Sequence, residues 1–425
     1  MGQRSEQVQL HPGRTRLQLP LTEFCRCHKL LQENRTIDAG IIQSFFLIFT
    51  GAAVLASAAL YTRQPLLVAY IVLGCLIGPH GLALVADPEL LSEVAEIGII
   101  FLLFLVGLDL PPAKLKNMAG AGFLTALFTT GVFFGIGFGL MWSFGFTLSE
   151  AIITGVAACF SSTIIGVKLL PTTVLHHRHV GEIVIALLLI QDLLAIFALV
   201  LITGYGESVS DTLSNLGTAM LALPIIAGAA FLSVRYLLLP LIARFDAFHE
   251  FIFLIAIGWC LGLASAAEAV GLSFEIGAFI AGVSLATSPI SQYIAEHLKP
   301  LRDFFLVMFF FSVGAELNAS LLLHVFFPTI LLAMALIAAK PVAFTLALKW
   351  QGENSSTSWE VGYRLGQASE FSLLLSYVAS AAMLLSPEAA HVIQGATVIT
   401  LIISSYIVVF RYPSPIAISE KLRRD

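Results

Sequence analysis

Residues 180–204 read VGEIVIALLLIQDLLAIFALVLITG, a long apolar run with an amide and a carboxylate, Gln191 and Asp192, at its centre. A helix of about 20 apolar residues crosses a hydrocarbon core of ~30 Å. A charged side chain at mid-span costs about 3 kcal/mol on insertion scales, so it usually faces a protein interior or a water-filled path. We therefore expect Asp192 to handle an ion or a proton. The alternative is a structural aspartate in a buried hydrogen-bond network.

The composition of the whole chain predicts a polytopic membrane protein. Hydrophobic residues make up 58% of the sequence and charged residues 12%, and the mean hydropathy is +0.92. Soluble proteins average about 25% charged residues. No phosphate loop, dinucleotide fingerprint or HExxH motif is present, and Cys25 and Cys27 lack the second pair of a zinc site. The sequence therefore predicts neither an enzyme nor a cofactor, and it gives no sign of nucleic-acid binding.

Apolar segments follow one another from residue 39 to residue 412 with short connections. Residues 1–38 are polar, and we expect a poorly ordered extension there. Residues 413–425 are expected to form a short tail on the cytoplasmic side. The transmembrane part is predicted to be all-α, with spans at 40–61, 65–83, 93–109, 119–144, 149–170, 180–204, 216–241, 248–267, 273–286, 301–316, 321–349, 358–384 and 388–411.

The basic residues test this division of the chain. When the connections are assigned alternately to two sides, the Lys and Arg residues of the loops all fall on one side, from Arg63 to Arg424. The positive-inside rule makes that side cytoplasmic, so the C-terminus is predicted inside and the N-terminus outside. The basic residues of the N-terminal extension conflict with this orientation. Either the extension is translocated despite its charge, or the true start lies downstream.

Two spans contain small and polar residues at mid-depth. The fifth span reads ITGVAACFSSTIIGVKLLP, with hydroxyl side chains at 161–163, and the twelfth reads SWEVGYRLGQASEFSLLLSYVASAAM. Such segments can break a helix, because hydroxyl groups and neighbouring helices satisfy the freed backbone. Transporters with inverted repeats place a broken helix in each half and bind the ion where the two cross. The alternative is that these small residues only allow close helix packing.

Further charges lie inside predicted spans. Lys340 stands directly before Pro341, whose ring disturbs the preceding helical turn. It can either exchange protons or act as a fixed counter-ion for Asp192. Arg364 stays charged, so we expect it to pair with Glu370 or Glu275, or to hold a gate shut. Glu275 and Glu370 are expected to be structural partners in this set of compensating charges rather than ligands of a transported ion.

Three histidines, His176, His177 and His179, lie together in a predicted cytoplasmic loop. Imidazole titrates near neutral pH, so this loop can sense pH. The simpler interpretation, which we favour, is a solvated basic loop that enforces topology.

Spans five and six together, SSTIIGVKLLPTT and HRHVGEIVIALLLIQDLLAI, resemble the monovalent cation:proton antiporter-2 family, in particular its Kef-type potassium:proton branch. The segments GIIFLLFLVGLDL (98–110), GLSFEIGAFIAGVSLA (271–286), FFFSVGAELN (309–318) and GQASEFSLLL (366–375) are similar to the family's other landmarks, in the same order. The resemblance covers roughly residues 40–411.

This resemblance implies a thirteen-span, inverted-repeat fold of the sodium:proton-antiporter type, with two crossing broken helices in a core domain and a separate dimerisation domain. Asp192 would be the carboxylate that binds cation and proton in turn. Gln191 occupies the place where electrogenic sodium:proton relatives carry a second aspartate. Lys340 resembles the lysine that faces the ion site in those relatives, whereas Arg364 matches no core motif.

Kef-type systems usually continue into a cytosolic nucleotide-binding domain, and this sequence ends shortly after the last span. Gating by a nucleotide within the same chain is therefore not expected, and a separate regulatory subunit or a truncation stays open. A homodimer in the bilayer of a bacterial inner (plasma) membrane is expected.

The mechanism expected from these residues is competition between a proton and a monovalent cation at Asp192. Oxygens of Gln191, Ser161, Ser162 and Thr163 would hold the cation beside the carboxylate. With one titrating acid, the simplest stoichiometry is one for one and electroneutral. Potassium is favoured and sodium is possible, since such oxygens suit both ions. The alternatives are a ligand-gated cation channel or efflux system on the same fold, and a solute:cation symporter, which a large cavity with aromatic lining would favour.

Overall fold

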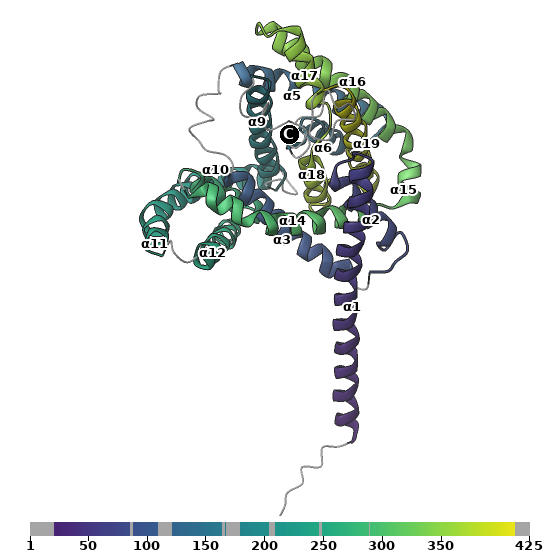
Figure 1. The fold of residues 1–425 in the computed structure, drawn as a ribbon, viewed down its shortest axis with the longest axis vertical. Helices are drawn as coiled ribbons and strands as arrows, with labels where there is room; N and C mark the ends of the chain where they lie inside the picture. Colours follow the sequence, from purple (N-terminus) through teal and green to yellow (C-terminus); the bar gives the residue numbers. More distant parts are fainter. Residues whose placement is uncertain are drawn as a thin grey trace, which may run out of the picture.

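The computed structural model describes residues 21–85, 88–108, 121–163, 166, 179–203, 209–245, 249–288 and 290–412. For residues 21–39, 88–90, 92, 121, 203, 209–220, 249 and 319 it describes the backbone alone. Within these ranges every regular element is a helix (Figure 1). The elements are α1 (Leu21–Tyr61), α2 (Leu66–Ile77), α3 (Pro88–Leu108), α5 (Ala121–Ser143), α6 (Leu148–Ala158), α9 (His179–Thr203), α10 (Val209–Ser233), the π-helical turn η1 (Val234–Leu238), α11 (Leu239–Arg244), α12 (His249–Glu268), α13 (Phe274–Ala286), α14 (Ser291–Glu316), α15 (Ala319–His324), α16 (Phe326–Trp350), α17 (Ser355–Arg364), α18 (Glu370–Ala381) and α19 (Pro387–Arg411).

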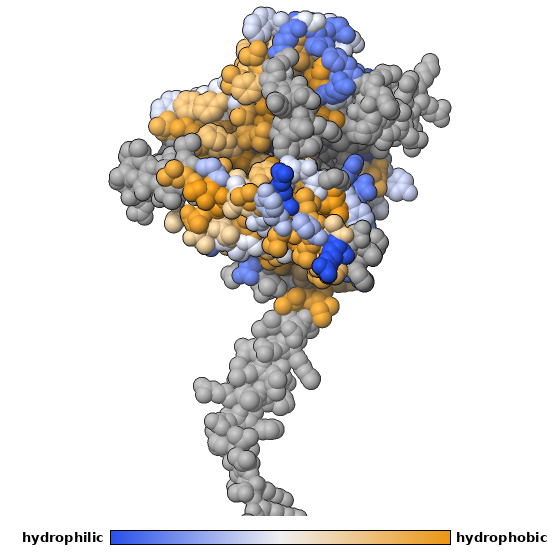
Figure 2. Space-filling view, turned by 90° about the vertical axis from the view of Figure 1, so that its left-hand side faces the viewer, coloured by the Kyte–Doolittle hydropathy of each residue, from blue (hydrophilic) through white to orange (hydrophobic). Residues whose placement is uncertain are grey.

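The predicted all-α membrane class is confirmed. Among the described residues, 7 helices are long and apolar enough to cross a bilayer, and shorter apolar helices lie at Leu66–Ile77, Leu148–Ala158, Phe274–Ala286 and Glu370–Ala381. Figure 2 shows a broad apolar surface on one face of the molecule, as expected for helices that face lipid. The count of thirteen spans stays a prediction.

Helix α1 begins at Leu21, well before the predicted start of the first span. The expectation of irregular structure is therefore wrong for the backbone of residues 21–38, and residues 1–20 lie outside the described part. The segment LTEFCRCHKLLQENR contains many Leu, Glu, Lys, Gln and Arg residues, which have high helix propensity. The polar segment consequently continues the helix that follows it, and α1 projects far from the bundle (Figure 1). The domain boundary at residue 38 stays a prediction.

The helices form two groups, each around a large buried core, and a smaller third core joins α1, α2, α3 and α14. One core joins residues of α5, α6, α9 and α16 to α19, in the upper part of Figure 1. A second core joins α3 with α10 to α13. Helices α3 and α14 run between the groups, and α14 also packs on α2 and α1. The group with α5, α6, α9 and α16 to α19 is called the core group below.

Glycines allow the closest helix crossings. A Cβ atom at Gly282 of α13 would collide with the carbonyl oxygen of Phe104 in α3, and one at Gly314 of α14 would collide with that of Ile71 in α2. Small residues permit such approach of helix backbones in membrane proteins. These crossings fix α3 and α14, which line one side of the candidate site.

Both predicted helix breaks are present. Helix α6 ends at Ala158 and the chain is non-helical through residues 160–162. Helix α17 ends at Arg364 and α18 begins only at Glu370. The two breaks meet inside the core group, as the hydrogen bonds described below establish. In contrast, α16 runs through Pro341 as one helix.

Candidate functional site

The first break is held by the side chain of Gln191 from the middle of α9. Its Oε1 accepts a hydrogen bond from the backbone N–H of Ser161 at 3.1 Å. Its Nε2 donates to the carbonyl oxygen of Cys159 at 3.3 Å. Only 1% of Gln191 is exposed, so this amide replaces the helical partners that both backbone groups lack. Gln191 therefore positions the break, and both ends of its amide are occupied in doing so.

The two breaks are joined by direct hydrogen bonds. Ser161 Oγ donates to the carbonyl oxygen of Leu365 at 2.9 Å, and Ser372 Oγ donates to that of Ala157 at 2.6 Å. Gln367 Nε2 donates to Arg364 O at 3.0 Å. These contacts satisfy carbonyl groups at the ends of α6 and α17, which have no partner within their helices.

Lys340 lies at the crossing and is completely buried. Its Nζ donates to the carbonyl oxygen of Phe160, to that of Gln367 at 3.0 Å and to Ser161 Oγ at 3.3 Å. Phe160 and Gln367 lie in the two non-helical breaks, so carbonyl oxygens from both breaks meet at one ammonium group. The ring of Phe133 lies 5.0 Å from Nζ. No ion pair between Lys340 and Asp192 is found in the described part of the chain, and the ammonium group instead binds carbonyl oxygens of the two breaks.

Asp192 is 3% exposed. Its carboxylate accepts from Thr163 Oγ1, at 3.2 Å to Oδ1 and 3.4 Å to Oδ2. The carboxyl group of Glu370, the first residue of α18, lies close enough for the two charges to repel each other. Of the polar residues predicted around Asp192, the structure thus brings Thr163 into contact with it. Ser162 is buried beside Thr163.

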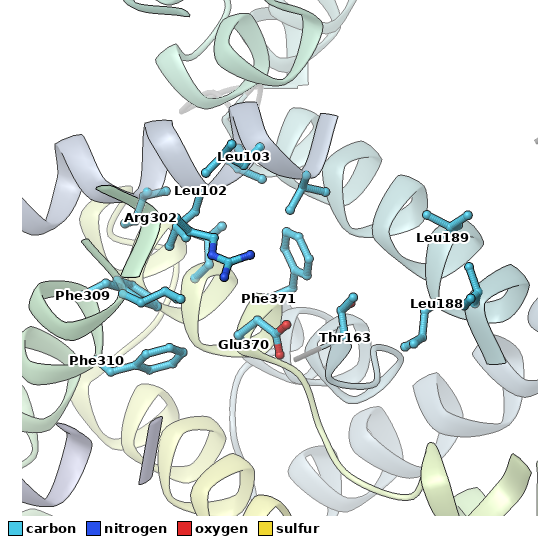
Figure 3. Close-up of a pocket in the computed structure, with 16 residues that line it drawn as sticks. Leu102, Leu103, Thr163, Leu188, Leu189, Arg302, Phe309, Phe310, Glu370 and Phe371 are labelled. Atoms are coloured by element: carbon cyan, nitrogen blue, oxygen red, sulfur yellow. The ribbon is translucent and has the colours of Figure 1, made fainter. Parts of the chain in front are cut away.

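A cavity of about 520 Å³ borders this site between α3, α9, α14 and α18. Thr163 and Glu370 form part of its wall, and Arg302 of α14 lies across from them (Figure 3). The remaining lining is apolar and includes Phe309, Phe310 and Phe371. Because Thr163 touches both the cavity and the carboxylate of Asp192, an ion in the cavity has a polar route to the aspartate.

Arg364 pairs with a residue that the sequence analysis did not name, and its predicted pairing with Glu370 or Glu275, or a role at a gate, stays a prediction. Its guanidinium pairs with Glu360, one turn earlier on α17, at 2.8 Å, and lies 5.7 Å from the ring centre of Tyr412. The i,i+4 spacing of the two charges on one helix was a signal in the sequence for this pair. Glu275 lies half-buried in the first turn of α13, in the other helix group, and is not part of the site.

Several site residues were missed by sequence reasoning. Ser372 and Arg302 are examples: nothing in the sequence distinguishes them from other serines or loop-proximal arginines. His179 Nε2 forms a 2.8 Å contact with Glu353, which joins the start of α9 to the α16–α17 connection. His176 and His177 lie outside the described residues. In the described ranges, no group of three or more His, Cys, Asp and Glu side chains is placed to hold a metal ion.

Comparison with known proteins gives a consistent result. Residues 45–410 match the model of the family described as sodium/hydrogen exchanger, transmembrane. The chain is 30% identical to K(+) efflux antiporter 4 of Arabidopsis thaliana, over 86% of this chain and 63% of that protein. It is 31% identical to the glutathione-regulated potassium-efflux system protein KefC of Salmonella arizonae, over 86% of this chain and 59% of that protein. The chain thus spans less than two thirds of these relatives.

Another relative and a solved structure extend this comparison. The iron transporter MagA of Paramagnetospirillum magneticum is 28% identical, over 84% of both chains. The fold matches the sodium proton antiporter MjNhaP1 of Methanocaldococcus jannaschii at pH 8 with a TM-score of 0.67 and 18% identity, covering 87% of this chain and 96% of that one.

Proposed function

Because this chain belongs to the sodium/hydrogen exchanger family, we propose that it exchanges a monovalent cation for protons across a membrane, by competition at Asp192. The observation that carries this proposal is a buried carboxylate that accepts a hydrogen bond from Thr163, a residue that also lines a cavity. Potassium is the favoured cation, since K(+) efflux antiporters are among the most similar relatives. Sodium is the second choice.

In the proposed cycle, the cation is held by the ionised carboxylate of Asp192 and the hydroxyl oxygen of Thr163, with Ser162 beside them. A proton that binds Asp192 removes its negative charge, and the cation then leaves. Either loaded state is neutral at the carboxylate and can cross, whereas the ionised aspartate alone is costly to move through lipid. One charge is exchanged for one, so the exchange is electroneutral.

The other predicted ligands take supporting roles in this proposal. Gln191 and Ser161 use their polar atoms to bind the backbone of the crossing, and Lys340 donates to carbonyl oxygens of both breaks. These residues keep the break in shape while the proton and the cation alternate. Glu370 places a second negative charge at the cavity wall, which attracts cations from the cavity.

The surroundings of the transporter are part of the proposal. We propose that it lies in a bacterial inner membrane with its C-terminus in the cytoplasm, as the distribution of basic loop residues predicts. The exposed apolar side chains of α10 to α12, among them Leu221, Ile225 and Leu254, are available to pair with a second copy. A separate regulatory subunit remains compatible with this arrangement.

Proteoliposomes with an imposed pH gradient test the proposal. Potassium, sodium and lithium are added separately, each with and without a clamp on membrane potential. We expect potassium to dissipate the gradient most strongly, and the clamp to leave the rate unchanged. Asp192→Asn should abolish exchange in a protein that still folds. Exchange retained by this variant would refute competition at Asp192.

The cavity beside Asp192 favours one second candidate function. Its volume of about 520 Å³ and its phenylalanine lining fall in the range of small-molecule sites, which suits a solute:cation symporter. Transport in liposomes that contain inorganic ions alone separates the two functions. An antiporter is fully active there, whereas a symporter moves cations only after an organic solute is added.

A further inference from the structure

A second cavity, of about 660 Å³, lies where the end of α14 meets the core group. Its wall includes Glu150, Glu316, Ser380, His391 and Gln394, from α6, α14, α18 and α19. The connections around it join α5 to α6, α14 to α15 and α18 to α19. The alternation of basic loops predicts all of these connections to be on the external side. This cavity is called the outer cavity below.

One of the two acids, Glu150, is fully engaged in structure. Its Oε2 accepts from the backbone N–H of Thr147 at 2.8 Å, within the capping box of α6. Its Oε1 accepts from the backbone N–H of Ser386 at 3.1 Å, the residue that caps α19. The carboxylate thus compensates two helix N-termini, which carry partial positive charge. Glu150 is therefore not available to a ligand.

His391 is engaged in the same way. Its Nδ1 contacts the carbonyl oxygen of Pro387 at 2.6 Å, and its Nε2 accepts from the backbone N–H of Asn318 at 3.0 Å. The first contact needs a proton on Nδ1 and the second needs a lone pair on Nε2, so the ring is neutral and both nitrogens are used. His391 adds neither charge nor a ligand atom to the outer cavity.

Two side chains of the cavity wall carry an oxygen atom without such contacts. Gln394 is only 4% exposed, yet its Oε1 has no hydrogen-bond partner among the described residues, and the same holds for Ser380 Oγ. A buried polar atom without a partner costs about 1–3 kcal/mol, which a bound ligand recovers. Glu316 adds an exposed carboxylate at the last residue of α14.

We propose that the outer cavity binds a monovalent alkali cation, held by Gln394 Oε1, Ser380 Oγ and the carboxylate of Glu316. Amide, hydroxyl and carboxylate oxygens are suitable ligands for such ions. One carboxylate matches one positive charge, and the C-terminal ends of α14 and α18 add partial negative charge. Glu96 lies close enough to Glu316 for its charge to interact and increases the attraction.

The location of the outer cavity suggests how a bound cation would act during transport, and this role rests on the proposed exchange function. Glu316 belongs to α14, whereas Ser380 and Gln394 belong to α18 and α19 of the core group. Transporters of this kind move one helix group against the other. A cation between Glu316 and Gln394 therefore links α14, which runs between the two groups, to the core group. It lies on the predicted external side, in a cavity separate from the one beside Asp192.

Equilibrium dialysis of the purified full chain with radioactive rubidium tests the outer site directly. Wild type is expected to bind at two sites, Asp192→Asn at one, and the triple variant Asp192→Asn, Glu316→Gln, Gln394→Leu at none. Glu388→Gln is the matched control, because it removes an exposed carboxylate from the first turn of α19 that does not line the cavity. It should leave both sites intact.

If the triple variant binds as much rubidium as Asp192→Asn, the proposal of an outer site is overturned. A result in which wild type and Asp192→Asn bind equally, and only Glu316→Gln loses an ion, would instead refute the central site and support the outer one. If the triple variant does not fold, Glu316→Gln in the Asp192→Asn background serves, since residue 316 is exposed. Its rubidium affinity should fall about tenfold, and unchanged affinity would also overturn the proposal.

Discussion

Replacement of Gln191 by leucine tests the account of the first helix break. Leucine fills a similar volume but lacks both polar atoms, so the Ser161 N–H and the Cys159 carbonyl lose the partners that they have at 3.1 and 3.3 Å. Each buried backbone group left alone costs about 2 kcal/mol, or about 4 kcal/mol for the pair. Burial of the leucine side chain recovers up to about 2 kcal/mol. The expected net loss of unfolding free energy is therefore about 2 kcal/mol.

The assay is reversible unfolding in mixed micelles, combined with exchange in proteoliposomes. Gln351→Leu is the matched control, because the same change at the end of α16 removes one hydrogen bond, from Nε2 to Thr125 Oγ1 at 2.7 Å, at a partly exposed position. It should cost about 1 kcal/mol or less and leave transport unchanged. Gln191→Leu should also slow exchange about tenfold or more, because small displacements of reacting groups have large effects on rate. Wild-type stability together with wild-type exchange would refute the positioning role of Gln191.

Other substitutions give further expected outcomes. Thr163→Val removes the hydroxyl group that contacts the carboxylate of Asp192 at 3.2 Å, so the cation concentration for half-maximal exchange should rise severalfold in transport assays. Thr163→Ser keeps a hydroxyl group and should keep the wild-type half-maximal concentration. Equal half-maximal concentrations for the two variants would contradict a ligand role of Thr163. A double-mutant cycle of Arg364→Met and Glu360→Gln should give a coupling of about 1–3 kcal/mol in unfolding experiments, because the pair is 2.8 Å apart and nearly buried on the arginine side; no coupling would show that another contact holds Arg364. Gly282→Ala should destabilise the protein by about 1–3 kcal/mol, because the added methyl group meets the backbone of α3; Gly131→Ala, with open space around the added atom, is the control.

The sequence was informative about which spans break and which charges are deep. Runs of small and polar residues at 159–163 and 366–370 predicted two breaks, because hydroxyl groups and neighbouring helices can satisfy the freed backbone. The structure has the non-helical residues at 160–162 and 365–369. Asp192 was singled out because a carboxylate in the middle of a membrane span is costly and usually has a function. Both signals are local, so one sequence sufficed.

The partners of those charges were not predictable in the same way. Lys340 was expected either to exchange protons or to act as a counter-ion for Asp192, and its Nζ lies between carbonyl oxygens of the two breaks. Gln191 was expected to bind the cation, but its amide binds the backbone. These outcomes depend on how α9 and α16 are rotated about their axes and on how the non-helical segments turn. Neither the rotation of a helix nor the path of a non-helical segment can be read from the spacing of residues in the sequence.

Competition at Asp192 is tested most directly by the rate of potassium exchange, measured in proteoliposomes at several pH values over a wide range of potassium concentrations. If proton and cation share one carboxylate, acidification raises the potassium concentration for half-maximal rate and leaves the rate at saturating potassium unchanged. In the acidic range the increase approaches about tenfold per pH unit, since one proton competes with one cation. A saturating rate that falls with acidification, at a constant half-maximal concentration, would contradict competition and place the proton at another group.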